Sequence, residues 1–205
     1  MAKKDRVHPT EDFNHKERRE REKAAVKAAT LKASRDLARQ LGWPNVSIRK
    51  IAKEIQYTPP VIYQHFKNKE AILMELEIQG FAKLKRELQT VAEKGGDPIP
   101  KLLNLTGAAW DWAFKESDLY QVMFNLDSIH AASPDPRSLS DSASVVLDTL
   151  KEIHLFDSEV DEYLFTWWAL LHGYISLIMS GQVSGKRSKM RQFLLEAVER
   201  FAKSI

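Results

Sequence analysis

Cysteine is absent from this 205-residue chain, and so is any apolar run long enough to cross a bilayer comfortably. Without cysteine the chain forms no disulfide and has no thiol for catalysis, and a reducing compartment is compatible with it. The longest apolar stretch, residues 164–179, is interrupted by Thr166, His172 and Ser176, which makes it too short and too polar for a membrane span. The first six residues are rich in charge and contain no apolar segment, so we expect no secretory signal.

Signatures of catalysis are missing as well. No glycine-rich phosphate loop follows a strand, no His-Glu-x-x-His motif occurs, and no nucleophile elbow is present. The histidines His130, His154 and His172 are not at metal-ligand spacing. We therefore expect a protein that is not an enzyme, with no catalytic residues, no metal site and no cofactor.

Patterns typical of β-strands are almost absent, whereas apolar residues recur at helical spacing along most of the chain. Hydrophobic residues make up 43% of the sequence, which is enough for a globular core. After a flexible basic tail over residues 1–15, we expect an all-α protein of about nine helices. Two are short helices within residues 46–70, and the others are expected over residues 14–41, 68–93, 98–114, 118–125, 138–153, 158–180 and 186–204, with a loop at 132–136.

The segment over residues 46–70 has the pattern of a helix-turn-helix. Ser47 is a good N-cap, because its hydroxyl satisfies an amide of the first helical turn. Thr58 is the next N-cap, and Pro59 stands at the first helical position, where a missing N–H costs nothing. Asn68 is placed to cap the helix that follows. Apolar residues spaced for a buried face are Ile48, Ile51, Ala52 and Ile55 in the first helix, and Ile62 and Phe66 in the second.

Charge is distributed unevenly along the chain. Residues 1–85 contain 19 Lys and Arg against 11 Asp and Glu, whereas the remaining residues contain 12 against 17. The first part therefore has a net charge of +8 and the rest −5, in agreement with the total of +3. A basic N-terminal part favours a nucleic-acid-binding module, although a run of charge is also compatible with an ordinary solvated face.

A longer signature is formed by Leu37, by Gly42-Trp43, by residues 46–52 and by residues 63–70. Through it, residues 25–75 resemble the DNA-binding domain of the TetR (tetracycline-repressor-like) family, whose Tyr-x-His-Phe-x-x-Lys-Glu pattern the last run matches. The chain departs from the family pattern at Gln56, where a turn glycine is frequent, at Pro59-Pro60, where Lys-Gly is commoner, and at Ala38, where an aromatic is frequent. The first two departures change the surface offered to bases, so an operator sequence does not carry over.

The resemblance implies that the second helix of the motif lies in the major groove of DNA. Base edges are expected to be contacted by Thr58, Pro59, Pro60, Val61 and Gln64. Proline and valine have no side-chain polar groups for reading bases, so they would contact thymine methyl groups. Phosphate contacts that set the register are expected from Ser47, Arg49, Tyr63, His65, Lys67 and Lys69.

Large aromatic residues crowd two regions of the C-terminal half. For most of them an ordinary core position is the simpler interpretation, and His172 is more readily a hydrogen-bonded core residue than a metal ligand. The alternative is an apolar cavity with a few polar groups, the usual form of a small-ligand site. The run from Trp168 to Gly173 also resembles a Trp-His-Gly (WHG) type of C-terminal domain in the same family. We expect a small, largely apolar ligand contacted by Trp110, Phe114, Tyr120, Met123, Phe124, Trp168 and His172, with helix 68–93 linking it to the DNA.

The last two long helices carry apolar stripes with a second candidate role. In the family that the chain resembles, two such helices pair with their copies in a four-helix dimer interface. A two-fold dimer spaces two recognition helices so that they meet successive major grooves on one face of a duplex. The expected interface residues are Leu164, Leu171, Ile175, Phe193, Ala197 and Phe201.

These features together predict a helix-turn-helix DNA-binding domain over residues 16–70 and a helical ligand-binding and dimerisation domain over residues 71–205. The predicted function is a ligand-responsive, sequence-specific regulator of transcription, in the first instance a repressor, that binds a palindromic operator in double-stranded DNA as a homodimer. The alternative is a non-enzymatic architectural or protein-interaction protein that binds DNA without sequence specificity. If the protein is such a sequence-specific regulator, we expect it to be cytoplasmic and nucleoid-associated, without a membrane partner.

Overall fold

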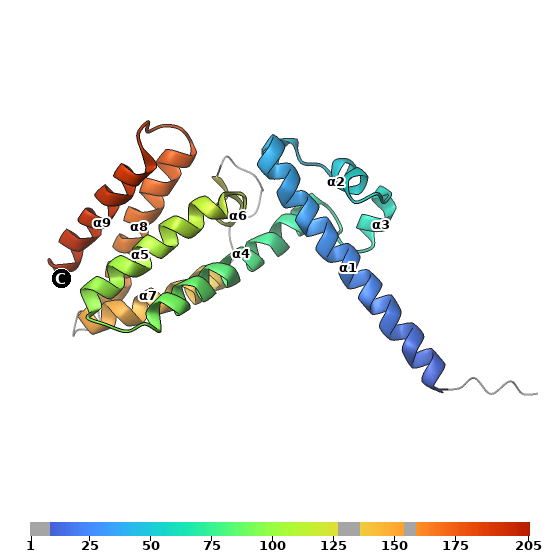
Figure 1. Ribbon diagram of the computed structural model, residues 1–205, viewed down its shortest axis with the longest axis horizontal. Coiled ribbons are helices and arrows are strands. Elements are labelled where there is room, and N and C mark those ends of the chain that lie inside the picture. Colours follow the sequence, from blue (N-terminus) through green and yellow to red (C-terminus); the bar gives the residue numbers. More distant parts are fainter. Residues whose placement is uncertain (1–8, 127–135, 154–158) are drawn as a thin grey trace, which may run out of the picture. The chain divides into compact units, whose positions relative to one another are not determined.

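The computed structural model describes residues 9–126, 136–153 and 159–205, which contain nine α-helices, one short 3-10 helix and no strand (Figure 1). The all-α fold expected from the sequence is confirmed. The helices are α1 (Pro9–Leu41), η1 (Trp43–Asn45), α2 (Ile48–Glu54), α3 (Pro59–Tyr63), α4 (Lys69–Ala92), α5 (Pro98–Lys115), α6 (Ser117–Met123), α7 (Pro136–Ile153), α8 (Val160–Met179) and α9 (Arg187–Ala202).

The helix boundaries lie close to those expected from the sequence, with one clear exception. α1 begins at Pro9, so residues 9–15 of the expected flexible tail are helical. In the part of α1 that follows, charged side chains one turn apart support the helix, as in the ion pair of 3.3 Å between Arg18 and Glu22. The composition of a charged, exposed helix is close to that of a solvated tail, which explains the error.

Some expectations fall on residues that the structure does not describe. These are the histidines His130 and His154 and most of the loop at 132–136, of which only Pro136, the first residue of α7, is described. Within the described ranges, no helix combines the length and the apolar character that crossing a bilayer requires.

The chain divides into two compact units, residues 1–72 and residues 73–205. α4 belongs to both, because it begins at Lys69 in the first unit and ends at Ala92 in the second. Asn68 caps this helix as the sequence predicts, since its side-chain oxygen accepts a hydrogen bond of 2.9 Å from the amide of Ala71.

The core of the N-terminal unit lies between α1, α2, α3 and the first turn of α4. Its buried apolar residues include Leu31, Ala33, Leu37, Ala38, Trp43, Ile51, Ala52, Ile62 and Phe66. Thr30 and Ser34 are buried on the same side of α1, and each hydroxyl donates a hydrogen bond of 2.8 Å to a carbonyl one turn earlier, which offsets the cost of their burial. Leu41, the last residue of α1, is 43% exposed, because the helix ends there and Gly42 (φ 76°) turns the chain.

The core of the C-terminal unit is built where α5, α7, α8 and α9 pack against one another. Trp110 of α5 and Trp167 of α8 are buried at its centre, and the indole N–H of Trp167 donates to Thr106 Oγ1 at 2.9 Å. A bidentate contact of Arg191 with Asp111, at 3.1 and 2.9 Å, holds α9 to α5. These buried tryptophans are therefore structural, and the indole of Trp167 has its hydrogen-bond partner inside the core.

Candidate functional site

α2 is held at both ends by local interactions. Ser47 Oγ accepts a hydrogen bond from the amide of Lys50 at 3.4 Å, as its N-cap role predicts. At the other end the amide of Tyr57 donates to the carbonyl of Ala52 at 2.9 Å, which is part of a Schellman motif. Gln56 stands in this turn with φ 59°, a left-handed conformation that favours glycine. The turn is thus formed at the residue where the family frequently has glycine, with Gln56 in a strained backbone conformation.

α3 has five residues and few amide donors at its start, because Pro59 and Pro60 have no N–H. Its first amide, that of Val61, donates to the carbonyl of Thr58 at 3.0 Å. Thr58 occupies the N-cap position, but its side chain makes no capping bond, so the hydroxyl is available to another partner. The N-terminus of α3 therefore offers side chains rather than backbone amides to an approaching anion.

The burial of Ile62 and Phe66 turns the opposite side of α3 and of the following turn outward, as the sequence predicts. The residues expected to contact DNA are distributed accordingly. Ser47, Arg49, Thr58, Pro60, Tyr63, Gln64 and Lys67 are exposed, whereas Pro59, Val61, His65 and Lys69 are half-buried. The fold therefore brings all the expected base-contacting residues together on one short segment, and their contacts with DNA remain predictions.

Lys69 differs from the other residues expected to contact phosphate. Its ammonium Nζ donates a hydrogen bond of 2.8 Å to the carbonyl of Trp43, 26 residues earlier in the chain. Partial burial lowers the pKa of Lys69, and the carboxylate of Glu70 opposes this shift. One of the three N–H donors of this lysine is thus already used to hold the start of α4 to η1.

In the C-terminal unit, four of the expected ligand residues form an aromatic cluster: Tyr120, Phe124, Trp168 and His172. The ring of Phe124 lies at its centre, with centroid distances of 4.6 Å to Tyr120, 5.1 Å to Trp168 and 5.0 Å to His172. Phe81 of α4 adds an edge-to-face contact at 5.6 Å. The sequence argument missed Phe81, although its place on the apolar stripe of α4 between Leu73 and Leu88 was a usable signal.

A hydrogen bond connects the two polar members of this cluster, since the Tyr120 hydroxyl lies 2.9 Å from His172 Nδ1. Burial raises the pKa of Tyr120 and lowers the pKa of His172, so burial favours the neutral form of both groups. In the imidazole tautomer with its proton on Nε2, Nδ1 accepts the tyrosine O–H. His172 is therefore a hydrogen-bonded residue of the cluster. No group of metal-ligating side chains suited to an ion occurs among the residues that the structure describes.

The internal space beside the cluster is far smaller than a ligand. It has a volume of about 10 Å³, room for about one water molecule, and is bordered by Tyr120, Trp168 and Leu171 among others. Trp110 is buried and pairs with Phe114 at a centroid distance of 4.8 Å. Met123 is also buried, against Gly80 of α4, where a Cβ atom would lie only 2.5 Å from the methionine sulfur. Among the residues that the structure describes, the space next to Trp168 is thus too small for a ligand, and Trp110 and Phe124 do not border it.

The expected dimer stripe on α8 also needs correction. Leu171 and Ile175 are 2% and 0% exposed and face the core of their own unit, so they offer no surface to a partner. The side of α8 that faces outward instead carries Phe165, which is 72% exposed. The helix is apolar on more than one side, so spacing alone did not identify its outer face. On α9, Phe193 is exposed, and Ala197 and Phe201 are half-buried, as is Leu164 on α8.

Comparison with known proteins decides the family. Residues 31–76 match the family described as bacterial regulatory proteins, tetR family, and residues 102–201 match the tetracyclin repressor-like C-terminal domain. The chain belongs to the TetR family. The first match covers the helix-turn-helix and the start of α4 in this TetR-family chain, and the second covers most of the helices from α5 to α9.

Individual relatives of this TetR-family protein are distant. It is 31% identical over 91 residues to the uncharacterized HTH-type transcriptional regulator YobS of Bacillus subtilis (strain 168), a match that covers 44% of this chain and about half, 47%, of YobS. A protein of unknown function from Rhodococcus sp. RHA1 is similar in structure, with a TM-score of 0.73, 18% identity, and coverage of 88% of this chain and 95% of that chain. The TetR family transcriptional regulator PfmR from Thermus thermophilus has a TM-score of 0.63, 15% identity, and coverage of 83% and 97%.

The role of Lys69 as an internal tie can be tested by substitution with methionine, which keeps most of the aliphatic stem but removes the ammonium. We expect Lys69→Met to lower the free energy of unfolding by about 1.5–3 kcal/mol, the usual contribution of a hydrogen bond from a charged donor. Lys67→Met, at an exposed neighbouring position, should change it by less than about 0.5 kcal/mol. Urea unfolding measures both values, and equal effects of the two variants would contradict the tie.

Proposed function

We propose that this TetR-family regulator is a ligand-responsive repressor that binds a palindromic operator as a homodimer. The observation that supports DNA recognition most directly is the arrangement of α3. Its inner side is anchored by Ile62 and Phe66, while Thr58, Pro60 and Gln64 are exposed. A helix held in this way presents a fixed row of side chains to the edges of bases in a major groove.

Within this proposal Gln64 is the residue that reads sequence by hydrogen bonds. An exposed glutamine amide has both a donor and an acceptor, and it matches the N6 and N7 groups of adenine. Val61 and Pro60 offer only apolar surface, which suits contact with thymine methyl groups. The proposed readout thus favours A·T pairs at the positions that face the middle of α3.

Phosphate binding must come chiefly from side chains in this protein. The two prolines at the start of α3 remove amides that would otherwise point toward an anion. Arg49, Tyr63 and Lys67 are exposed and carry the donors that remain. Lys69 contributes less than a free lysine in this proposal, because it is already hydrogen-bonded to Trp43.

Because Gln64 is proposed to recognise bases and Lys67 to bind phosphate, substitutions of these two residues should have different effects on DNA binding. Gln64→Ala should change which sequence is selected from random DNA, at a cost of about 1–3 kcal/mol for the original site. Lys67→Ala should weaken binding to all sequences and make the dependence of log K on log salt concentration shallower by about two units, about 0.9 for the lost contact in each subunit of the dimer. If the wild type binds every duplex equally well, the alternative of an architectural protein without sequence specificity is supported instead.

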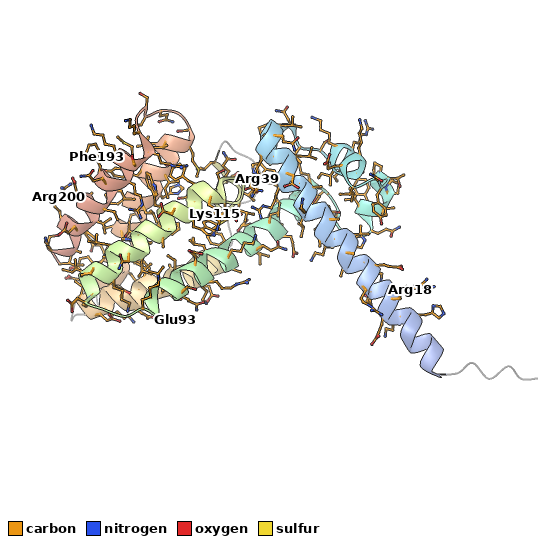
Figure 2. All side chains as sticks on the ribbon, in the orientation of Figure 1. Arg18, Arg39, Glu93, Lys115, Phe193 and Arg200 are labelled. Atoms are coloured by element: carbon orange, nitrogen blue, oxygen red, sulfur yellow. The ribbon has the colours of Figure 1, made fainter. Side chains whose placement is uncertain are left out.

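A dimer interface on α8 and α9 is supported by exposed apolar side chains. Phe165 on α8 and Phe193 on α9 are 72% and 39% exposed, and the two helices pack against each other (Figure 2). Exposed phenylalanines are costly in water and are common at the centre of protein interfaces. A second copy of the chain, related by a two-fold axis, would cover both.

Dimerisation is tested by placing a charge on this surface. Phe165→Glu should convert the protein to a monomer at micromolar concentration, because an unpaired carboxylate would have to be buried in the interface. Met74→Glu, the same kind of change at an exposed apolar residue of α4, serves as the control and should leave the dimer intact. Analytical ultracentrifugation distinguishes the two, and a monomeric wild type would count against the homodimer.

A small, largely apolar ligand is proposed to act at the cluster of Tyr120, Phe124, Trp168 and His172. The support is chemical, since three aromatic rings surround one hydrogen-bonded imidazole and provide an apolar contact with a polar end. The space beside the cluster is only about 10 Å³, so such a ligand would bind a conformation of the C-terminal unit in which this space is larger. It would then release DNA by stabilising that conformation, provided that DNA prefers the other one.

The ligand proposal is tested by screening small apolar compounds for release of a fluorescent operator. A compound that acts at the cluster should change the tryptophan emission of the wild type. This change should be reduced in Trp168→Phe, where Trp167 still borders the small space, and kept in full in Trp112→Phe, whose tryptophan is buried in the same unit and does not border it. A releasing compound whose emission change is undiminished in Trp168→Phe would place its site elsewhere.

A further inference from the structure

α1 is much longer than the part that the family match requires. The helix begins at Pro9, whereas the match to the DNA-binding domain begins at residue 31, so residues 9–30, 22 residues, precede it. At a rise of 1.5 Å per residue this segment is about 33 Å long, close to one turn of B-form DNA. Within the N-terminal unit, Figure 1 shows this part of α1 extending beyond α2 and α3. We call residues 9–30 the α1 extension.

The α1 extension and α3 enclose a groove that opens beside the outward side of α3. Its volume is about 530 Å³, and its lining includes Arg19, Lys23 and Val26 on one wall and Tyr57, Val61 and Gln64 on the other. Val61 and Gln64 are residues to which the proposed function assigns base contacts. The groove is therefore continuous with the surface that is proposed to enter the major groove.

The charges on the extension suit an anionic occupant. Over its whole length the extension contains six Lys and Arg against five Asp and Glu, and residues 15–30, which include the groove wall, contain six against three. Arg19, on the groove wall, has no hydrogen-bond or ion-pair partner among the described residues. Lys23 is held by Glu20 at 3.0 Å, and the acidic side chain on this wall, Glu22, is paired with Arg18 at 3.3 Å. Figure 2 shows Arg18 on the projecting part of α1.

We propose that the α1 extension is a second DNA-contacting element, which binds the sugar–phosphate strand bordering the major groove entered by α3. Arg19 and Lys23 contact phosphates of that strand, and the apolar floor at Val26 packs against its sugars. This inference rests on the proposed DNA-binding function and lengthens the stretch of DNA that the protein would contact. Because the extension is a continuous helix of about one duplex turn, it contacts DNA outside the base pairs that α3 reads.

Two matched double variants of the full chain test this proposal. Arg19→Gln with Lys23→Gln removes the two cations on the groove wall. Lys16→Gln with Arg21→Gln removes two cations from the same helix that do not line the groove, and all four side chains are exposed. The first variant should make the salt dependence of operator binding shallower by about four units, since the dimer loses two phosphate contacts in each subunit and each contact accounts for about 0.9. The second should change it by less than about half a unit.

Hydroxyl-radical footprinting gives an independent readout of the same variants. The wild type should protect the backbone of a flanking segment in addition to the positions that respond to Gln64→Ala. This flanking protection should disappear in the variant of Arg19 and Lys23 and persist in the variant of Lys16 and Arg21. If both double variants reduce the salt slope equally and keep the flanking protection, the groove does not hold DNA and the inference is overturned.

The proposed function and the role of the extension are overturned by different results. A wild type that binds no DNA fragment in preference to another overturns the proposed function, and the footprint of the extension with it. A wild type that selects an operator through Gln64, but whose affinity and footprint do not respond to Arg19 and Lys23, overturns only the role of the extension.

Discussion

A helix of five residues is not stable by itself in water, because helix nucleation costs more than so few hydrogen bonds return. α3 exists because Ile62 and Phe66 are buried against α1 and α2. That burial fixes not only the helix but also the direction in which Thr58, Pro60 and Gln64 project. DNA recognition by this protein therefore depends on the small apolar core of the N-terminal unit.

Local interactions were predictable from the sequence, because their partners are only a few residues apart. Ser47 and Asn68 cap their helices as expected, and Ile51 and Ile62 are buried where helical spacing places them. Non-local contacts were not predictable. The bond between Lys69 and the carbonyl of Trp43 joins residues 26 positions apart, and nothing in the local pattern distinguishes this lysine from Lys67. The position of a helix can therefore be predicted from the spacing of its apolar residues. The hydrogen-bond partner of a long side chain cannot be predicted in this way.

The same limit explains the corrections in the C-terminal unit. α8 is apolar on several sides, so the sequence showed that it would be buried but not which side would face its own core. Leu171 and Ile175 face the core and Phe165 does not. The abundance of tryptophan suggested the walls of a cavity, because a buried indole needs a partner for its N–H. Trp167 has that partner in the Thr106 hydroxyl, so a packed core accounts for it without a cavity.

α4 joins the two units of the chain by covalent continuity. Lys69 at its start is bonded to η1 in the N-terminal unit, and Phe81 lies against Phe124 of the aromatic cluster in the C-terminal unit. Twelve residues of one helix separate them, about 18 Å at the usual rise. The small space at Trp168 is bordered directly by Leu84 and Leu88 of the same helix, and Phe81 packs on Phe124 beside it. Under the proposed ligand response, a ligand that enlarges this space would therefore act first on side chains of α4, the helix that continues into the DNA-binding unit.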